Sequence, residues 1–132
     1  MARVLFVCLH NAGRSQMSRA FFDRDAAGRH ESDSAGTTPG ERVHAVVVDV
    51  MCELGIDVAE RVPQKLTTEL AGWADVVVTM GCGDECPYIP GTRYVDWELE
   101  DPAGQGPDAV RRTRDEIARR VGALLEELDA VA

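Results

Sequence analysis

The chain has 132 residues, enough for one domain with its own apolar core. Its 45% hydrophobic and 28% charged residues are typical of a soluble globular protein, and its net charge of −9, with no basic stripe, argues against nucleic acid or an anionic membrane as a partner. The apolar runs are too short for a membrane span or a signal peptide. We therefore expect a single domain over residues 1–132, a monomer in the cytoplasm, where cysteines are more often reactive or metal-binding than paired in structural disulfides.

Strands and helices are expected to alternate along the chain. Apolar, β-branched runs predict strands at 3–7, 30–34, 75–80 and 93–95, and helical spacing of apolar residues predicts helices at 15–27, 43–54, 67–73 and 108–128. Parallel strands joined by helical crossovers form an open α/β sheet with helices on both faces, which binds ligands beyond the carboxyl ends of its strands. On the helix at 43–54, Cys52 is expected to be a buried apolar residue rather than a redox thiol.

The most informative segment follows the first predicted strand, where Cys8 is separated by five residues from Arg14 and Ser15. A helix N-terminus and a neighbouring arginine favour the thiolate form of a cysteine, and a serine hydroxyl can donate to that thiolate. A guanidinium binds a tetrahedral oxyanion with two donors. We expect the loop amides to surround the same oxyanion together with Arg14; these loop residues are Leu9, His10, Asn11, Ala12 and Gly13. The alternative, without a catalytic role, is that Cys8 is a buried cysteine at a strand end.

A second cysteine pair, Cys82 and Cys86, lies in a glycine-containing loop that ends at a proline. Two thiols at this spacing form a disulfide if the loop bends. The functional interpretation is a relay in which Cys8 attacks the substrate, Cys82 attacks the Cys8 adduct and Cys86 resolves the resulting disulfide. A zinc site or unused surface thiols are the alternatives, although zinc normally needs four protein ligands.

An acidic segment after the last predicted strand supplies candidates for a general acid. A thiolate displaces oxygen from arsenic or phosphorus only if the departing oxygen is stabilised, most simply by a proton from a carboxylic acid. Asp101, fixed by the proline that follows it, is the best candidate. Its competitors are Asp96, Glu98 and Glu100, and the segment could also be a solvated acidic loop.

Together these segments resemble the arsenate reductases built on the low-molecular-weight protein tyrosine phosphatase fold. The resemblance covers nearly the whole chain, and its motifs are specific in combination. Besides the Cys8 loop, continued by Gln16 and Met17, and the cysteine pair, they are residues 33–37 (DSAGT), 76–80 (VVVTM), 101–103 (DPA) and 114–117 (RDEI).

The resemblance implies a four-stranded parallel sheet and conversion of arsenate to arsenite. Cys8 is then the nucleophile, and Ser15 stabilises its thiolate. Arg14 and the loop amides hold the oxyanion, while Asp101 is the general acid. In thioredoxin-coupled members two further cysteines, here Cys82 and Cys86, complete the relay, and reduced thioredoxin reduces their disulfide. We expect neither a bound cofactor nor a metal.

Two loop positions depart from the family pattern: His10 stands where glycine is usual, and Gly13 where a second cysteine is frequent. The relay cysteines are also closer in sequence than usual. A histidine at position 10 changes the loop's backbone preferences, but it could also add a donor to an anion.

Some members bind potassium near the loop through asparagine, serine and acidic side chains. Asn11 and Ser34 match that pattern, but Arg19 and Lys65 stand where carboxylates are expected. Since these two side chains repel a cation, we predict no potassium requirement.

Alternative functions stay open. A tyrosine phosphatase on the same fold needs only Cys8, Arg14 and Asp101, but such phosphatases usually carry an aromatic residue where this chain has Ala103. A non-catalytic oxyanion-binding or zinc-dependent regulatory module would work without Cys8 as nucleophile. The electron donor is open too: thioredoxin suits a cysteine pair, whereas mycothiol with a glutaredoxin-like partner needs only Cys8.

Overall fold

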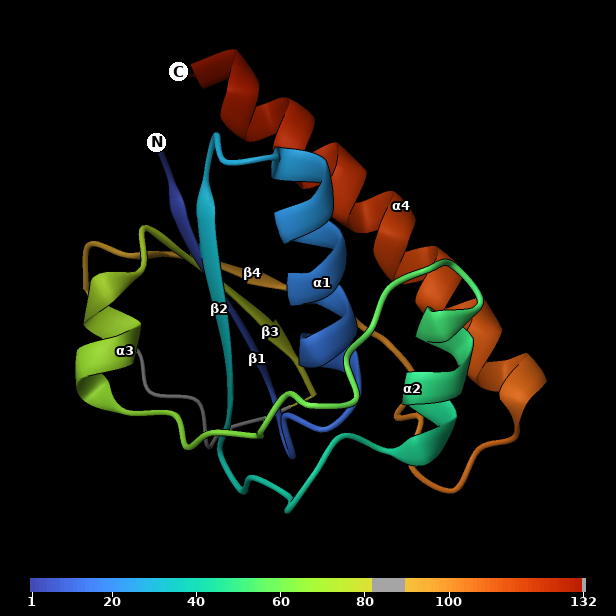
Figure 1. Cartoon of the computed structure of the whole chain (residues 1–132). Coiled ribbons are helices and arrows are strands. Elements are labelled where there is room, and N and C mark those ends of the chain that lie inside the picture. The colour runs from blue at the N-terminus through green and yellow to red at the C-terminus, as the bar shows by residue number, and fades with distance from the viewer. Residues whose placement is uncertain (82–89, 132) are drawn as a thin grey trace.

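One parallel sheet forms the centre of the molecule (Figure 1), and the computed structural model describes residues 1–81 and 90–131. Its strands are β1 (Arg3–Cys8), β2 (Glu31–Gly36), β3 (Val76–Met80) and β4 (Arg93–Asp96). They lie in the order β2-β1-β3-β4, with every neighbouring pair parallel. The two apolar strands β1 and β3 are therefore internal, so Cys8 at the carboxyl end of β1 lies near the middle of the sheet edge.

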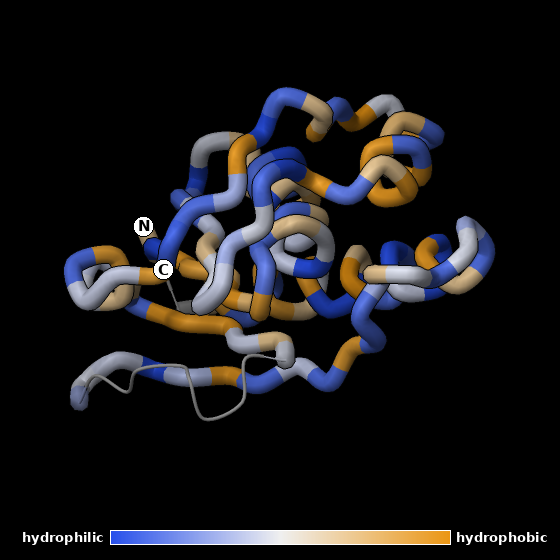
Figure 2. Tube along the Cα trace, turned by 90° about the horizontal axis from the view of Figure 1, so that it is seen from below, coloured by the Kyte–Doolittle hydropathy of each residue, from blue (hydrophilic) through white to orange (hydrophobic). Residues whose placement is uncertain are grey.

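Helices cover both faces of the sheet. Figure 1 shows α1 (Arg14–Ala26), α2 (Ala45–Cys52) and α4 (Pro107–Val131) on one side and the short α3 (Thr68–Trp73) on the other. Figure 2 shows hydrophobic and hydrophilic residues interleaved along the chain. The predicted four-stranded open parallel sheet with helices on both faces is confirmed.

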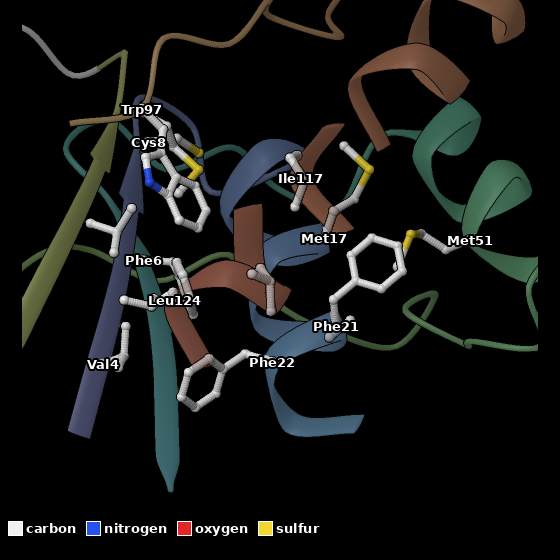
Figure 3. Close-up of a cluster of buried hydrophobic side chains, with 14 of the residues drawn as sticks. Val4, Phe6, Cys8, Met17, Phe21, Phe22, Met51, Trp97, Ile117 and Leu124 are labelled. Atoms are coloured by element: carbon white, nitrogen blue, oxygen red, sulfur yellow. The ribbon is translucent and has the colours of Figure 1, made fainter. Parts of the chain in front are cut away.

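The alternation of side chains along β1 divides the core into two clusters. Val4, Phe6 and Cys8 face the larger cluster, which is built with α1, α2 and α4 (Figure 3). Leu5 and Val7 face the smaller cluster under α3. Because a parallel sheet covered on both faces has no solvated side, residues 4–7 are fully buried. The thiol of Cys8 thus belongs to the same face as the start of α1.

Three sequence predictions about the elements need correction. The second strand runs to Gly36 instead of ending at 34, because Ala35 and Gly36 pair in register with the end of β1. The second helix covers only Ala45–Cys52, since the backbone of its expected start bonds to another segment described below. Cys52 is exposed rather than buried, because it lies on the solvent side of α2.

No helix in the ranges 1–81 and 90–131 has the length and apolarity needed to cross a bilayer.

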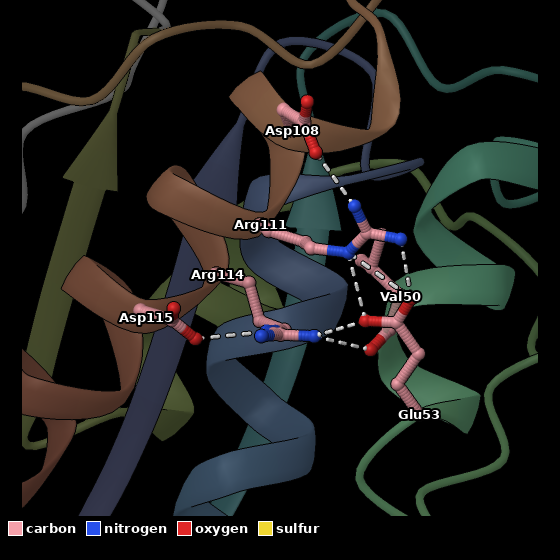
Figure 4. A network of polar contacts seen from close by, with 6 residues as sticks. All are labelled: Val50, Glu53, Asp108, Arg111, Arg114 and Asp115. Carbon is pink, nitrogen blue, oxygen red and sulfur yellow. Dashed lines mark hydrogen bonds and ion pairs between the residues drawn. The ribbon is translucent and has the colours of Figure 1, made fainter.

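A charged cluster ties the end of α2 to α4 (Figure 4). Glu53 accepts hydrogen bonds from Arg111, the shortest at 2.7 Å, and from Arg114 Nη1 at 2.8 Å. Arg114 is largely buried and also donates to the carbonyl of Val50 at 2.8 Å. Hydrogen bonds from Arg111, and next from Arg114, lower the pKa of Glu53 from 4.5 to about 2. The contact between the two helices therefore includes an ion pair that forms only when Glu53 is ionised.

Candidate active site

The loop between β1 and α1, residues 9–13, lies along the segment 37–44. Backbone amides of that segment donate to the carbonyls of the loop, with donor–acceptor distances of 3.4 Å (Thr37 to Cys8), 2.8 Å (Thr38 to Leu9), 2.9 Å (Gly40 to His10) and 2.9 Å (His44 to Ala12). These bonds hold the carbonyls on the side of the loop that faces 37–44. The bond from His44 also holds the backbone of that residue, whose ψ of 137 is non-helical, so α2 begins at Ala45.

The amides of the same loop are left available. In the described chain, none of the backbone N–H groups of residues 9–15 donates to a protein acceptor. Asn11 has φ 51, in the left-handed region, which turns the chain tightly between strand and helix. Since α1 begins at Arg14, its first-turn amides add the positive end of a helix dipole. A loop of this kind binds a tetrahedral anion through backbone donors.

Asn11 is fully buried, and its amide orientation is fixed by its partners. The backbone N–H of Gln64, which can only donate, bonds to Asn11 Oδ1 at 3.0 Å, and Gln16 Nε2 donates to the same oxygen at 3.1 Å. Gln16 Nε2 also donates to the Asn11 carbonyl at 3.1 Å. The Nδ2 group of Asn11 must therefore point to Ser15, to whose Oγ it donates at 2.7 Å.

This orientation determines what Ser15 does. Its oxygen accepts from Asn11, so its own hydrogen is free to point to Cys8 Sγ, 2.9 Å away. Cys8 is a free, buried cysteine, 2% exposed. A hydroxyl that donates to sulfur favours the thiolate over the thiol. The Asn11 network, which we define as Asn11, Gln16, Gln64, Ser15 and Cys8, thus directs a hydroxyl donor at the Cys8 sulfur.

Arg14 and Asp101 meet at the mouth of the loop. Arg14 is buried, and its Nη2 lies 3.6 Å from Asp101 Oδ2. The other oxygen of Asp101 accepts from the amide of Ala103 at 3.0 Å. The Asp101 side chain is 42% exposed, so it can exchange a proton with solvent as a general acid must.

The packing of the loop explains why a glycine suits position 13. A Cβ built at Gly13 would lie 2.5 Å from Cγ of Pro102, so only a glycine leaves room for the proline ring. The segment that carries Asp101 therefore packs directly against the Cys8 loop. A side chain at position 13 would therefore have to displace the Pro102 ring or the loop.

The remaining predicted residues occupy different positions. His10 Nδ1 lies 3.1 Å from the carbonyl of Thr38, so its ring is bonded to the flanking segment. Asp96 accepts from Thr79 Oγ1 at 2.8 Å, at the end of the sheet, which leaves Asp101 as the acid paired with Arg14. Cys82 and Cys86 lie outside the described residues.

Gln16 and Gln64 were not predicted from the sequence as residues that orient Asn11. Gln16 was part of the motif, but nothing in the sequence linked it to Asn11. Gln64 acts through its backbone amide from 53 positions away, which no side-chain pattern reveals.

Arg19 and Lys65, the two side chains expected to repel a potassium ion, have polar partners of their own. Arg19 Nη1 lies 3.3 Å from Asp33 Oδ1, and Lys65 Nζ donates to the Thr37 carbonyl at 2.7 Å. Ser34 Oγ is buried with no hydrogen-bond partner among the described residues. The absence of a potassium requirement stays a prediction.

Arg61 adds to the positive charge of this region. Burial, and next the nearby charge of Arg19, lowers its pKa. Over the part of the chain that the structure describes, no three His, Cys, Asp or Glu side chains gather into a group that could hold a metal ion.

Residues 3–131 match the low molecular weight phosphotyrosine protein phosphatase family, and the chain belongs to that family. Within it, a putative arsenate reductase of Halobacterium salinarum is 43% identical over 94% of this chain and 91% of its own length. A glutaredoxin arsenate reductase of Synechocystis is 34% identical, over 97% of this chain and 99% of its own. The resemblance to arsenate reductases on this fold is confirmed.

A solved structure supports the same resemblance to arsenate reductases. The thioredoxin-dependent arsenate reductase of Corynebacterium glutamicum superposes with a TM-score of 0.88 at 36% identity. The match covers all of this chain and 64% of that one, so the chain spans less than two thirds of that protein's length.

Proposed function

We propose that this protein reduces arsenate to arsenite, with Cys8 as nucleophile and reduced thioredoxin as the electron donor. The observation that carries the proposal is the assembly of four groups: the Cys8 sulfur, the Ser15 hydroxyl 2.9 Å from it, and the Arg14–Asp101 pair at the loop mouth. They surround a loop whose amides have no protein acceptor in the described chain. The named relatives support arsenate as the oxyanion.

In the first step, the Cys8 thiolate attacks the arsenic of arsenate, and an S–As bond forms while an As–O bond breaks. Asp101 protonates the departing oxygen, which leaves as water. Arg14 and the loop amides bind the remaining arsenate oxygens, where negative charge is concentrated during attack. Ser15 holds the sulfur as thiolate until the bond forms.

In the second step, the Cys82 thiolate attacks Cys8 Sγ, and the electron pair of the S–As bond passes to arsenic. Arsenic(V) becomes arsenic(III), arsenite leaves, and a Cys8–Cys82 disulfide remains. Cys86 then attacks Cys82, which frees Cys8 and leaves a Cys82–Cys86 disulfide. Two electrons from the thioredoxin dithiol reduce that disulfide and restore the enzyme.

This chemistry also indicates where the protein works and with what. Reduced thiols and thioredoxin are available in the cytoplasm, so we place the protein there. The proposal needs no bound cofactor, resident metal, nucleic acid or membrane, and a monomer carries every residue it uses. A glutaredoxin system is the competing donor, because one relative is named for it.

A Cys86→Ser variant tests the relay. After one equivalent of arsenate, we expect this variant to release arsenite once and to hold a Cys8–Cys82 disulfide, identified by peptide mass spectrometry. Cys52→Ser is the matched control, because Cys52 is an exposed free thiol on α2. That control should turn over many times with thioredoxin. Unchanged multiple turnover of Cys86→Ser would contradict the relay.

Measuring aryl phosphate hydrolysis and arsenate reduction on the same purified protein decides between arsenate reduction and the phosphatase alternative. It needs the same Cys8, Arg14 and Asp101 groups and no second thiol. Efficient hydrolysis of an aryl phosphate, together with no arsenate reduction by either thioredoxin or glutaredoxin, would replace arsenate reduction by phosphatase activity. Loss of both activities in Cys8→Ser would exclude the non-catalytic module.

A further inference from the structure

Gly81, directly after β3, lies against the side chain of Arg14. A Cβ built on Gly81 would overlap Arg14 Nη1 and would lie 3.1 Å from its Cζ and 3.2 Å from its Nη2. The guanidinium therefore packs against the backbone of Gly81 and occupies the space that the Cβ of any other residue would fill. Gly81 also has φ 89, a conformation that favours glycine.

The polar contacts of Arg14 are too long to hold its guanidinium without this packing. Nη1 donates to the Leu99 carbonyl at 3.4 Å, and Nη2 lies 3.6 Å from Asp101 Oδ2. Both distances are beyond the usual range of a strong charge-assisted bond. Arg14 is nonetheless buried, with 7% of its side chain exposed. Contact with Gly81 is thus a main restraint on where the guanidinium lies.

We propose that Gly81 is a positioning residue that sets the place of the Arg14 guanidinium relative to the anion loop. This inference rests on the proposed role of Arg14 as an oxyanion ligand. A Cβ at position 81 meets the far end of a flexible side chain rather than backbone, so the arginine shifts and the sheet does not. The expected result is a folded protein that binds oxyanions poorly.

Gly91 offers a matched control. It has φ 90, nearly the same as Gly81, but a Cβ built there meets nothing within 4 Å. Gly81→Ala and Gly91→Ala therefore carry the same kind of backbone strain, and only Gly81→Ala adds a contact with Arg14. Gly81→Ala should lose at least as much thermal stability as Gly91→Ala, because it must also displace the buried guanidinium.

Binding of inorganic phosphate, measured by calorimetry, gives the first test. We expect Gly81→Ala to weaken binding by about ten- to a hundredfold, the cost of losing one hydrogen bond to a charged group, and Gly91→Ala to leave it unchanged. In an Arg14→Ala background, Gly81→Ala should have no further effect. Equal weakening by both glycine variants, or an undiminished effect without Arg14, would overturn the proposal.

A second measurement is independent of anion binding. In protein labelled with ¹⁵N-arginine, the Nε–H resonance of Arg14 should move in Gly81→Ala and stay in place in Gly91→Ala. An Arg14 resonance unaffected by Gly81→Ala would also overturn the positioning role. If wild-type protein bound neither phosphate nor arsenate, the proposed function would fail, while the resonance would still decide whether Gly81 positions Arg14.

Discussion

Two polar clusters of this molecule, the Asn11 network and the Glu53 cluster with Arg111 and Arg114, differ in burial and in charge. Asn11 is fully buried and its partners are neutral amides, a hydroxyl and a thiol. The Glu53 side chain is 39% exposed, and its partners are guanidinium groups. The comparison shows that one cluster orders the loop that follows Cys8 and the other fixes the contact between two helices.

The physical reason is the cost of losing a partner. A buried amide left without its hydrogen bond keeps the full cost of desolvation, whereas an exposed ion pair is screened by water and salt. The Asn11 network is therefore sensitive to any single substitution, and the amides and the hydroxyl that hold it together carry no charge that a moderate change of pH would alter. The Glu53 cluster should tolerate substitution and respond to acid.

The largest effect is expected for Asn11→Ala. The substitution leaves the Gln64 N–H without its acceptor, removes one of the two acceptors of Gln16 Nε2 and the amide that donates to Ser15 Oγ, and puts alanine at φ 51. We expect about 2–4 kcal/mol lower stability in urea unfolding and arsenate turnover reduced by about a hundredfold or more.

Asn11→Gly separates the two causes. Glycine accepts φ 51 without strain but removes the same side-chain bonds. This variant should regain part of the stability and none of the activity. Activity close to wild type in Asn11→Gly would mean that the backbone turn alone, and not the network, organises the loop.

Ser15→Ala should have the next largest effect. The Cys8 thiolate loses the hydroxyl that donates to it, so Cys8 should react more slowly. We expect alkylation of Cys8 by iodoacetamide at pH 7, followed by mass spectrometry, to slow by about tenfold. Ser18→Ala is the control, because Ser18 is equally buried on α1 but bonds to the Arg14 carbonyl at 2.8 Å and not to the thiol. An unchanged alkylation rate in Ser15→Ala would remove Ser15 from the mechanism.

The sequence could predict the features that depend on local patterns, and it could not predict those that depend on contacts with distant parts of the chain. The strands and helices were predictable because apolar periodicity reports burial, and the Cys8 loop because its spacing between strand and helix is rare. The end of β2 and the start of α2 were not, since both depend on bonds to distant backbone: Gly36 pairs with Cys8, and His44 donates to Ala12. Gln64 was missed for the same reason.

A smaller effect, with opposite pH behaviour, is expected for Glu53→Gln. The pKa of Glu53 is lowered in the folded protein, so the ionised carboxylate stabilises the fold above pH 4.5 and loses this contribution as the pH falls toward about 2. Wild type should lose more thermal stability over this range than Glu53→Gln, and the two should differ only slightly at pH 7. Parallel losses in both proteins would show that the cluster does not contribute.

The smallest effect, no effect at all, is expected for potassium. Asp33 Oδ1 accepts from Gln64 Nε2 at 2.8 Å and pairs with Arg19, so a charged contact here adjoins the neutral Asn11 network. Because Arg19 and Lys65 already supply positive charge, an added cation gains little and meets repulsion. Arsenate turnover should be equal in potassium and sodium chloride at constant ionic strength. A sharp rise with potassium would mean that the Asn11 network needs a cation in addition to the charges of Arg19 and Lys65, and that its hydrogen bonds alone do not hold the loop in its active geometry.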